Sequence, residues 1–158
     1  MFDRRRWTAT LLATSSLALV ACAPNPPSGN WLFVDTGVVQ NTCNNNDATP
    51  NDGNFTLLNN QNGTFTVDPE DGSDPFNCVL DGENFSCPDR VQDTIQGLNA
   101  SIEVSVSIVG FFDSDTYAEG TQKASVTCTG DGCGAAQIFT GIDFPCIIEE
   151  SFTASFKG

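Results

Sequence analysis

The segment Ile102-Glu103-Val104-Ser105-Val106-Ser107-Ile108 decides the fold class of this chain. Apolar side chains occupy every second position and polar side chains lie between them, which is the period of a strand with one buried face. The β-branched residues at the apolar positions favour the same extended conformation. The segment therefore predicts an amphipathic β-strand, and the rest of the chain repeats its pattern in shorter runs.

These shorter runs are bounded by glycine, asparagine and aspartate, and after residue 21 no window keeps a helical period over three turns. Val91 and Ile95 are four residues apart, which is compatible with a single helical turn in residues 89–99. About eight antiparallel strands in such a length predict an all-β domain, either a small barrel or a sandwich. Strands are predicted at 31–34, 53–58, 64–67, 76–80, 84–87, 102–108, 121–129, 136–144 and 147–156.

The runs at 53–58 and 64–67 predict a hairpin whose register follows from its apolar residues. A three-residue loop pairs Leu57 with Phe65 and Phe55 with Val67, so that four apolar side chains share one face. A two-residue turn would place Phe65 opposite an asparagine instead. The hydrophobic register is the one predicted here.

A second hairpin lies between Cys78 and Cys87. Gly82 and Glu83 fit a two-residue type II′ turn, which takes glycine at its first position. Counting back from that turn makes the two cysteines a directly opposed, non-hydrogen-bonded pair. The Cα atoms of such a pair are about 4.5 Å apart, within reach of a disulfide.

The chain has seven cysteines, and six remain if Cys22 has another role. An even number of cysteines is typical of a disulfide framework in an oxidising compartment. Cys128 and Cys133 bound a short loop and form the second predicted pair, which leaves Cys43 to join Cys146. The last pair connects an early segment to the final strands, as closure of a barrel or sandwich requires. Without histidine or C-x2-C spacing, the cysteines do not indicate a metal site.

The first 22 residues have the organisation of an export signal. Three arginines at 4–6 precede an apolar-to-small run at 8–21, which ends at Cys22. Fourteen residues are too few to span a bilayer as a helix, but they are typical of the apolar region of a signal peptide.

The end of this run, Leu19-Val20-Ala21-Cys22, resembles the lipobox of bacterial lipoproteins. The resemblance implies cleavage before Cys22, acyl chains on that residue, and a membrane as partner through those chains. In that family, aspartate after the cysteine marks retention in the inner membrane. Because Ala23 follows Cys22 here, the resemblance points to the cell envelope at the outer membrane. An ordinary signal peptide that happens to end before a cysteine is the alternative.

The expected organisation is a signal peptide at 1–21, a lipidated cysteine with a proline-rich tether at 22–29, and one β-domain at 30–158. A charge-free segment rich in proline is typical of an extended spacer that lifts a domain off the bilayer.

The start of the β-domain, Gly29-Asn30-Trp31, resembles the Gly-x-Trp of lipocalin-like barrels, in which the tryptophan closes one end. The resemblance implies a small barrel that binds an apolar ligand. The second lipocalin motif, Thr-Asp-Tyr, is absent, since Tyr117 follows Asp115 and Thr116. The alternative is that Trp31 is simply a core aromatic at the start of a strand.

Charge excludes several classes of function. The net charge of the whole chain is −14 and there is no histidine. After residue 21, 19 acidic residues face only Arg90, Lys123 and Lys157, a net charge of −16. A nucleic-acid partner needs a basic face, and a polybasic contact with lipid head groups needs the same, so both are excluded. The absence of histidine excludes Ser-His-Asp and Cys-His catalysis.

Two acidic clusters lie in predicted loops and could hold Ca²⁺, which takes six to eight oxygen ligands. Neither cluster has the spacing of an EF-hand, and solvated loop tips are the alternative, so no cofactor is expected apart from this candidate. The candidate ligands are Asp68, Glu70, Asp71, Asp74, Asp113, Asp115 and Glu119.

Two functions follow from these features. The first is a non-enzymatic envelope lipoprotein whose β-domain binds a small apolar ligand or an envelope protein, or is structural. The second is a hydrolase that uses carboxylates. It would require two acids from different strands about 5–10 Å apart in a cleft lined by aromatic residues.

Overall fold

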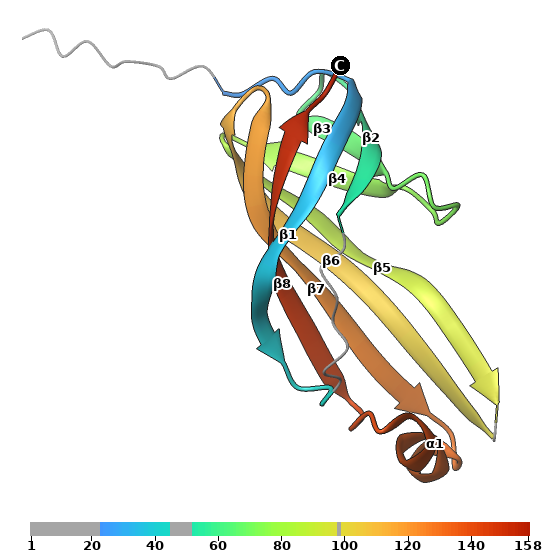
Figure 1. Cartoon of the computed structure of the whole chain (residues 1–158). Coiled ribbons are helices and arrows are strands. Elements are labelled where there is room, and N and C mark those ends of the chain that lie inside the picture. Colours follow the sequence, from blue (N-terminus) through green and yellow to red (C-terminus); the bar gives the residue numbers. More distant parts are fainter. Residues whose placement is uncertain (1–22, 45–51, 98) are drawn as a thin grey trace, which may run out of the picture.

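The computed structural model describes residues 23–44, 52–97 and 99–158. The predicted signal peptide and the predicted lipidation at Cys22 lie outside these residues. The described chain is all-β with one short helix (Figure 1). The strands are β1 (Gly29–Asn41), β2 (Gly53–Asn59), β3 (Thr64–Asp68), β4 (Phe76–Asp81), β5 (Asn84–Gly97), β6 (Ala100–Ser114), β7 (Tyr117–Thr129) and β8 (Cys146–Phe156), and α1 (Cys133–Thr140) precedes β8.

The strands form a closed antiparallel barrel in which each pairs with the next and β8 pairs with β1. This up-and-down order decides between the barrel and the sandwich that the sequence left open. Closure depends on β1, which pairs with β2 over residues 29–33 and with β8 over most of its length. Full closure leaves the upper part of the sheet with no free edge.

The barrel is longer on one side than on the other. Strands β2, β3 and β4 have five to seven residues, whereas the remaining five have 11 to 15. The long strands continue below the short ones as a curved sheet in the order β5-β6-β7-β8-β1 (Figure 1). Closed barrel and open sheet therefore lie end to end, and the interior of the barrel opens toward the sheet.

Each half has its own apolar core. The barrel core surrounds Trp31, whose side chain is 0% exposed, and contains most of the buried phenylalanines. The core of the open sheet is smaller and gathers Val126, Ile148 and Phe144 around the Cys43–Cys146 pair. The strand pattern at residues 102–108 serves both, because Ile102 packs in the lower core and Ile108 in the barrel.

Two glycines face each other inside the barrel, Gly110 on β6 and Gly120 on β7. A Cβ atom on Gly110 would lie 2.6 Å from the Phe85 ring, and one on Gly120 would lie 2.9 Å from the Phe152 ring. The missing side chains thus make room for two aromatic rings. The same Cβ atoms would also meet backbone oxygens of the neighbouring strand at 2.4 and 2.3 Å.

The three disulfides join the same cysteines that the sequence pairs: Cys43–Cys146, Cys78–Cys87 and Cys128–Cys133. The β4–β5 hairpin has the predicted register, with Leu80 opposite Phe85, and Gly82 has the positive φ that its turn requires. The Cys78–Cys87 bridge spans the hairpin on its buried face. The Cys128–Cys133 bridge links the end of β7 to the start of α1.

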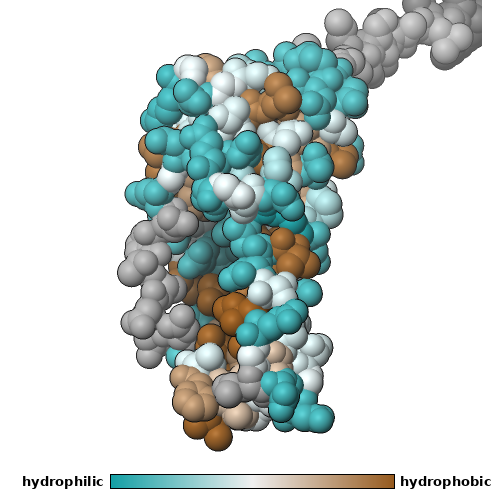
Figure 2. All heavy atoms as spheres, turned by 90° about the vertical axis from the view of Figure 1, so that its right-hand side faces the viewer, coloured by the Kyte–Doolittle hydropathy of each residue, from teal (hydrophilic) through white to brown (hydrophobic). Residues whose placement is uncertain are grey.

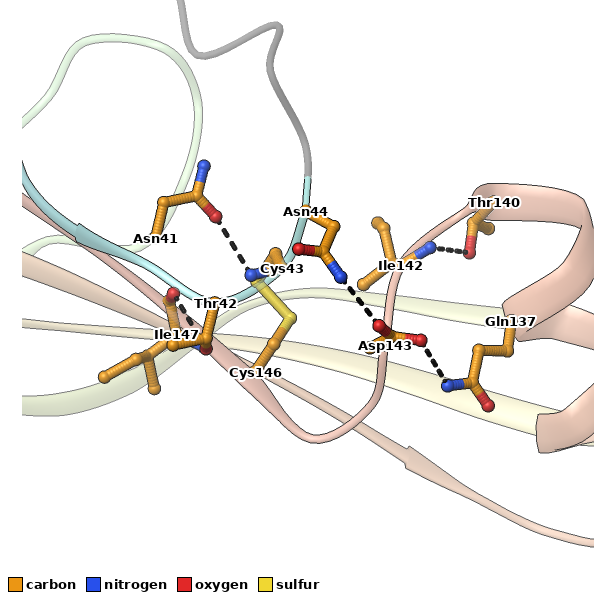
Figure 3. The surroundings of a disulfide bond; sticks show 10 residues. All are labelled: Asn41, Thr42, Cys43, Asn44, Gln137, Thr140, Ile142, Asp143, Cys146 and Ile147. Carbon is orange, nitrogen blue, oxygen red and sulfur yellow. Dashed lines mark hydrogen bonds between the residues drawn. A yellow bond between two sulfur atoms is a disulfide. The ribbon is translucent and has the colours of Figure 1, made fainter.

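The Cys43–Cys146 bridge fastens the far end of β1 to the start of β8 (Figure 3). The Thr42 N–H donates to the carbonyl of Ile147 at 2.9 Å, and the Ile147 N–H donates back to Thr42 Oγ1 at 2.9 Å. Beside it, both oxygens of Asp143 accept hydrogen bonds, from Asn44 Nδ2 at 2.6 Å and from Gln137 Nε2 on α1 at 2.8 Å. The bridge therefore lies at the point where β1, β8 and α1 meet.

The predicted register of the β2–β3 hairpin is wrong by two residues. Leu57 pairs with Val67 and Asn59 with Phe65, whereas Leu57 was expected opposite Phe65. The loop still has three residues, but it is 61–63, with Gly63 at φ +79° in the last position, where a left-handed residue is needed. The shift by an even number keeps the apolar side chains on the inner face.

One further prediction is wrong, and one segment that the sequence left open is now assigned. Residues 136–144 were expected as a strand, but 133–140 form α1, which ends at Gly141 in the left-handed conformation, its N–H bonded to the carbonyl of Gln137. Residues 89–97 are not a helical turn but continue β5 alongside β6. Within the described ranges, no helix is long and apolar enough to cross a membrane.

The predicted tether is not free over residues 25–28. Pro26 is among the most completely buried side chains, and its carbonyl accepts a hydrogen bond from Asn59 Nδ2 at 2.8 Å. The Asn25 N–H donates to Asp115 Oδ1 at 2.8 Å, and Ser28 Oγ accepts from the Asn59 N–H at 2.9 Å. This segment packs across the closed end of the barrel, so the expected spacer lies against the domain.

Candidate binding cavity

The interior of the barrel holds a cavity of about 350 Å³. Pockets for small ligands have volumes of about 300–1,000 Å³, so this one suits a compact ligand. Figure 2 shows apolar side chains in a hollow about halfway down one face, bordered by hydrophilic ones. Eight aromatic residues line the cavity: Trp31, Phe33, Phe55, Phe65, Phe76, Phe85, Phe112 and Phe152.

Trp31 closes the upper end of the cavity. Its ring stacks on Phe55 at a centroid distance of 6.2 Å and meets Phe112 and Phe156 edge-on at 6.0 and 5.7 Å. The indole Nε1–H donates to the carbonyl of Pro27 at 3.2 Å, which satisfies its only polar atom. The indole therefore connects the cavity to the N-terminal segment that covers the closed end.

Phenylalanines form the walls because inward-facing positions of several strands carry them. Phe65 of β3, Phe85 of β5 and Phe112 of β6 pack with centroid distances of 5.1–5.7 Å. Across the barrel, Phe33 of β1 stacks on Phe152 of β8 at 4.9 Å. Because these rings pack against one another, they form a wall that is already in place before a ligand enters.

Polar side chains gather at the lower end of the cavity, where the barrel opens to the sheet. Gln122 of β7 and Glu150 of β8 are directly opposed, and both line the cavity. Burial raises the pKa of the Glu150 carboxyl, and the negative charge of Asp35 raises it further. The cavity thus has an apolar closed end and a polar open end.

Arg90 lies against the wall near this open end. Its guanidinium carbon is 3.9 Å from the centroid of the Phe76 ring. Nη2 donates to Ser73 Oγ at 3.4 Å and also contacts Gln92 Oε1. The other two nitrogens, Nε and Nη1, are buried and have no hydrogen-bond partner within residues 23–44, 52–97 and 99–158.

Sequence reasoning counted Arg90 only as a charge and missed its position. In a regular strand residues 89 and 91 would share the inner face with Cys87. A register shift after Cys87 instead places Arg90 opposite Val106, which faces the core. Pro88 lies within this shift, and proline inside a sheet is typical of a bulge, so Pro88 is the signal that could have indicated this orientation.

The acidic clusters lie in the β3–β4 loop, near the β6–β7 turn and at the adjoining strand ends, where hydrogen bonds within the chain engage most of their members. In the β3–β4 loop, Glu70 accepts from Thr56 Oγ1 at 2.6 Å. Asp71 accepts from the hydroxyl and N–H of Ser73, bonds that lower its pKa. Near the β6–β7 turn, Tyr117 donates its hydroxyl to Glu119 at 3.0 Å. Among the described residues, no group of three or more acidic or cysteine side chains is placed to hold a metal ion.

Comparison of the chain with protein-family models, with curated proteins and with solved structures gave no match. The functional argument therefore starts from the cavity itself. Fold and site together define a small up-and-down β-barrel with an apolar interior. The interior is closed at one end and is open, with polar side chains, at the other.

Proposed function

We propose that this chain is an envelope-anchored lipoprotein whose barrel binds a small apolar ligand without transforming it. The observation that carries this proposal is the cavity of about 350 Å³ lined by eight aromatic side chains. Removing apolar surface from water contributes about 25 cal/mol per Å², so an apolar molecule gains more by entering this cavity than a polar one.

The anchor part of the proposal is supported by the lipobox-like segment that ends at Cys22. One acyl chain gives only marginal membrane binding, whereas two or three hold a protein stably. The net charge of −16 after residue 21 offers no attraction to anionic lipid head groups, so the acyl chains would supply the anchoring.

Binding is tested by the fluorescence of Trp31, which is the only tryptophan after residue 21. All the described contacts lie within residues 23–158, so a soluble form of those residues, exported to an oxidising compartment, retains the barrel. Titration with 1-decanol is expected to change the emission saturably, because the indole forms one end of the cavity. No saturable change in a folded sample would contradict the proposal.

Two alanine variants form a matched pair for this titration. Ala154→Leu adds three carbons to a side chain that lines the cavity, and it is expected to weaken decanol binding. Ala135→Leu adds the same atoms at an exposed position of α1 and is expected to leave binding unchanged. Circular dichroism verifies that both variants are folded.

A carboxylate hydrolase is the second candidate, because one observation favours it. Glu150 lines the aromatic cavity, and its raised pKa reports burial together with the charge of Asp35 on the neighbouring strand. Raised carboxyl pKa values are typical of general acids. Hydrolysis of nitrophenyl glycosides, abolished in Glu150→Gln, would favour the hydrolase over a binding protein.

A further inference from the structure

Arg90 has two nitrogens without a partner in the part of the chain that the structure describes. Nε and Nη1 are buried, and neither has a hydrogen-bond acceptor among the described residues. A guanidinium is always charged in proteins, so the side chain cannot avoid this situation by losing a proton. Leaving a buried charged donor unsatisfied is unfavourable, and such groups in native structures call for an explanation such as a missing ligand.

The position of the guanidinium relates it to the cavity. It lies over the Phe76 ring at 3.9 Å, and Phe76, Cys87 and Asp71 all line the cavity. The ring covers one face of the planar group, whereas hydrogen bonds are made in the plane. Nε and Nη1 together carry three N–H groups in that plane. Arg90 does not itself line the cavity and both nitrogens are covered, so a head group at the edge of the cavity reaches these donors only when a neighbouring side chain such as Phe76 moves aside.

The nearby acid makes no hydrogen bond to Arg90. Asp71 feels the positive charge, which helps to lower its pKa, but its Oδ1 accepts the hydroxyl and the N–H of Ser73 instead. No hydrogen bond joins a described carboxylate to either free nitrogen. After residue 21 the net charge is −16, and the basic residues besides Arg90 are two lysines. Lys123 is exposed on β7 and Lys157 lies beyond the end of β8.

We infer that Arg90 binds the carboxylate of an amphiphile whose apolar part occupies the barrel cavity. The inference rests on the proposed binding function and names its ligand class. A carboxylate satisfies N–H groups of arginine with charge-assisted hydrogen bonds, which are shorter and stronger than neutral ones. The apolar tail lies among the phenylalanines, and the head group remains at the polar end, where the cavity opens.

The test compares decanoate with 1-decanol, which share an apolar tail and differ in the head group. For the wild-type form of residues 23–158, decanoate is expected to bind about tenfold more tightly, the factor that corresponds to one favourable charge-assisted contact. In Arg90→Met the preference is expected to disappear while decanol affinity is retained. Methionine preserves apolar contact with Phe76, and Arg90→Lys, which keeps the charge, is expected to retain part of the preference.

Lys123→Met is the matched control, because it removes one positive charge from an exposed position of β7. It is expected to leave the ratio of the two affinities within about twofold of wild type, since exposed charges are screened beyond about 8 Å in physiological salt. Circular dichroism shows whether each variant is folded.

The outcomes separate this inference from the function on which it rests. If decanol binds and the ratio is the same in wild type and Arg90→Met, the role of Arg90 is wrong and the apolar cavity stands. If Lys123→Met abolishes the preference as Arg90→Met does, the effect is general charge and the inference is again wrong. If neither compound binds to the folded protein, the proposed function fails together with the inference.

Discussion

The disulfides offer the sharpest test of how this small barrel is stabilised. Two double variants, Cys43→Ala/Cys146→Ala and Cys78→Ala/Cys87→Ala, each remove one bridge. The first bridge joins residues 103 apart in sequence, and the second joins residues nine apart. All four side chains are at most 4% exposed, so both variants lose a similar amount of buried sulfur.

The difference between the two variants therefore isolates the entropy of the unfolded chain. In the loop-entropy description, a bridge across about 100 residues contributes about 4.7 kcal/mol, and one across nine residues contributes about 2.6 kcal/mol. Loss of the long bridge is expected to lower the free energy of unfolding by about 2 kcal/mol more than loss of the short one.

Urea unfolding followed by far-UV circular dichroism measures both free energies, provided that each transition is two-state. The Cys128→Ala/Cys133→Ala variant extends the series to a separation of five residues, with an expected loss of about 2 kcal/mol. Equal losses for the long and short bridges, or a larger loss for the short one, would refute the argument from unfolded-chain entropy.

Three further predictions concern single residues. The raised pKa of Glu150 means that the folded state keeps this proton at pH values above 4.5, where the unfolded state has lost it. The free energy of unfolding is therefore expected to fall as the pH rises from 4.5 through the raised pKa of the folded state. Glu150→Gln is expected to melt at a higher temperature than wild type at pH 7 and at the same temperature at pH 3; a lower melting temperature at pH 7 would contradict this. Gly120→Ala places a Cβ 2.3 Å from the carbonyl oxygen of Val109 and is expected to lower the free energy of unfolding in urea by about 1–3 kcal/mol. Gly134→Ala, with open space around it, is expected not to lower the free energy of unfolding. Cys22→Ser is expected to move the expressed protein from the detergent phase to the aqueous phase or to leave an uncleaved precursor, and unchanged partitioning after processing would exclude the lipid anchor.

Local rules predicted the parts of this fold in which neighbouring residues decide the geometry. The turn at Gly82 determines the pairing from Leu80 outward, and that pairing places Cys78 opposite Cys87. The alternation in β6 reflects a strand with one buried face, which depends on side-chain period alone. The Cys43–Cys146 pair followed by elimination once the two local pairs were assigned.

Where distant segments decide the outcome, the sequence was less informative. Residues 136–144 were predicted as a strand, yet Ile138 and Phe139 lie on α1 and are 86% and 78% exposed. Residues 89–97 have little strand pattern of their own and extend because β6 offers a long partner. The candidate site depends on the same kind of information, since the inward direction of Arg90 follows from a bulge against β6.

The N-terminal segment that packs across the closed end also determines how the barrel would stand on a membrane. Three peptide units separate Cys22 from Asn25, whose N–H is bonded to Asp115 on the barrel. An extended chain spans at most about 3.6 Å per residue, so acyl chains on Cys22 would hold the closed end within about 11 Å of the lipid surface. With such an anchor the connecting segment would be too short for the barrel to turn over, and the open end would face away from the bilayer. Ligand would enter and leave on the aqueous side, by a route that does not pass through the anchoring membrane.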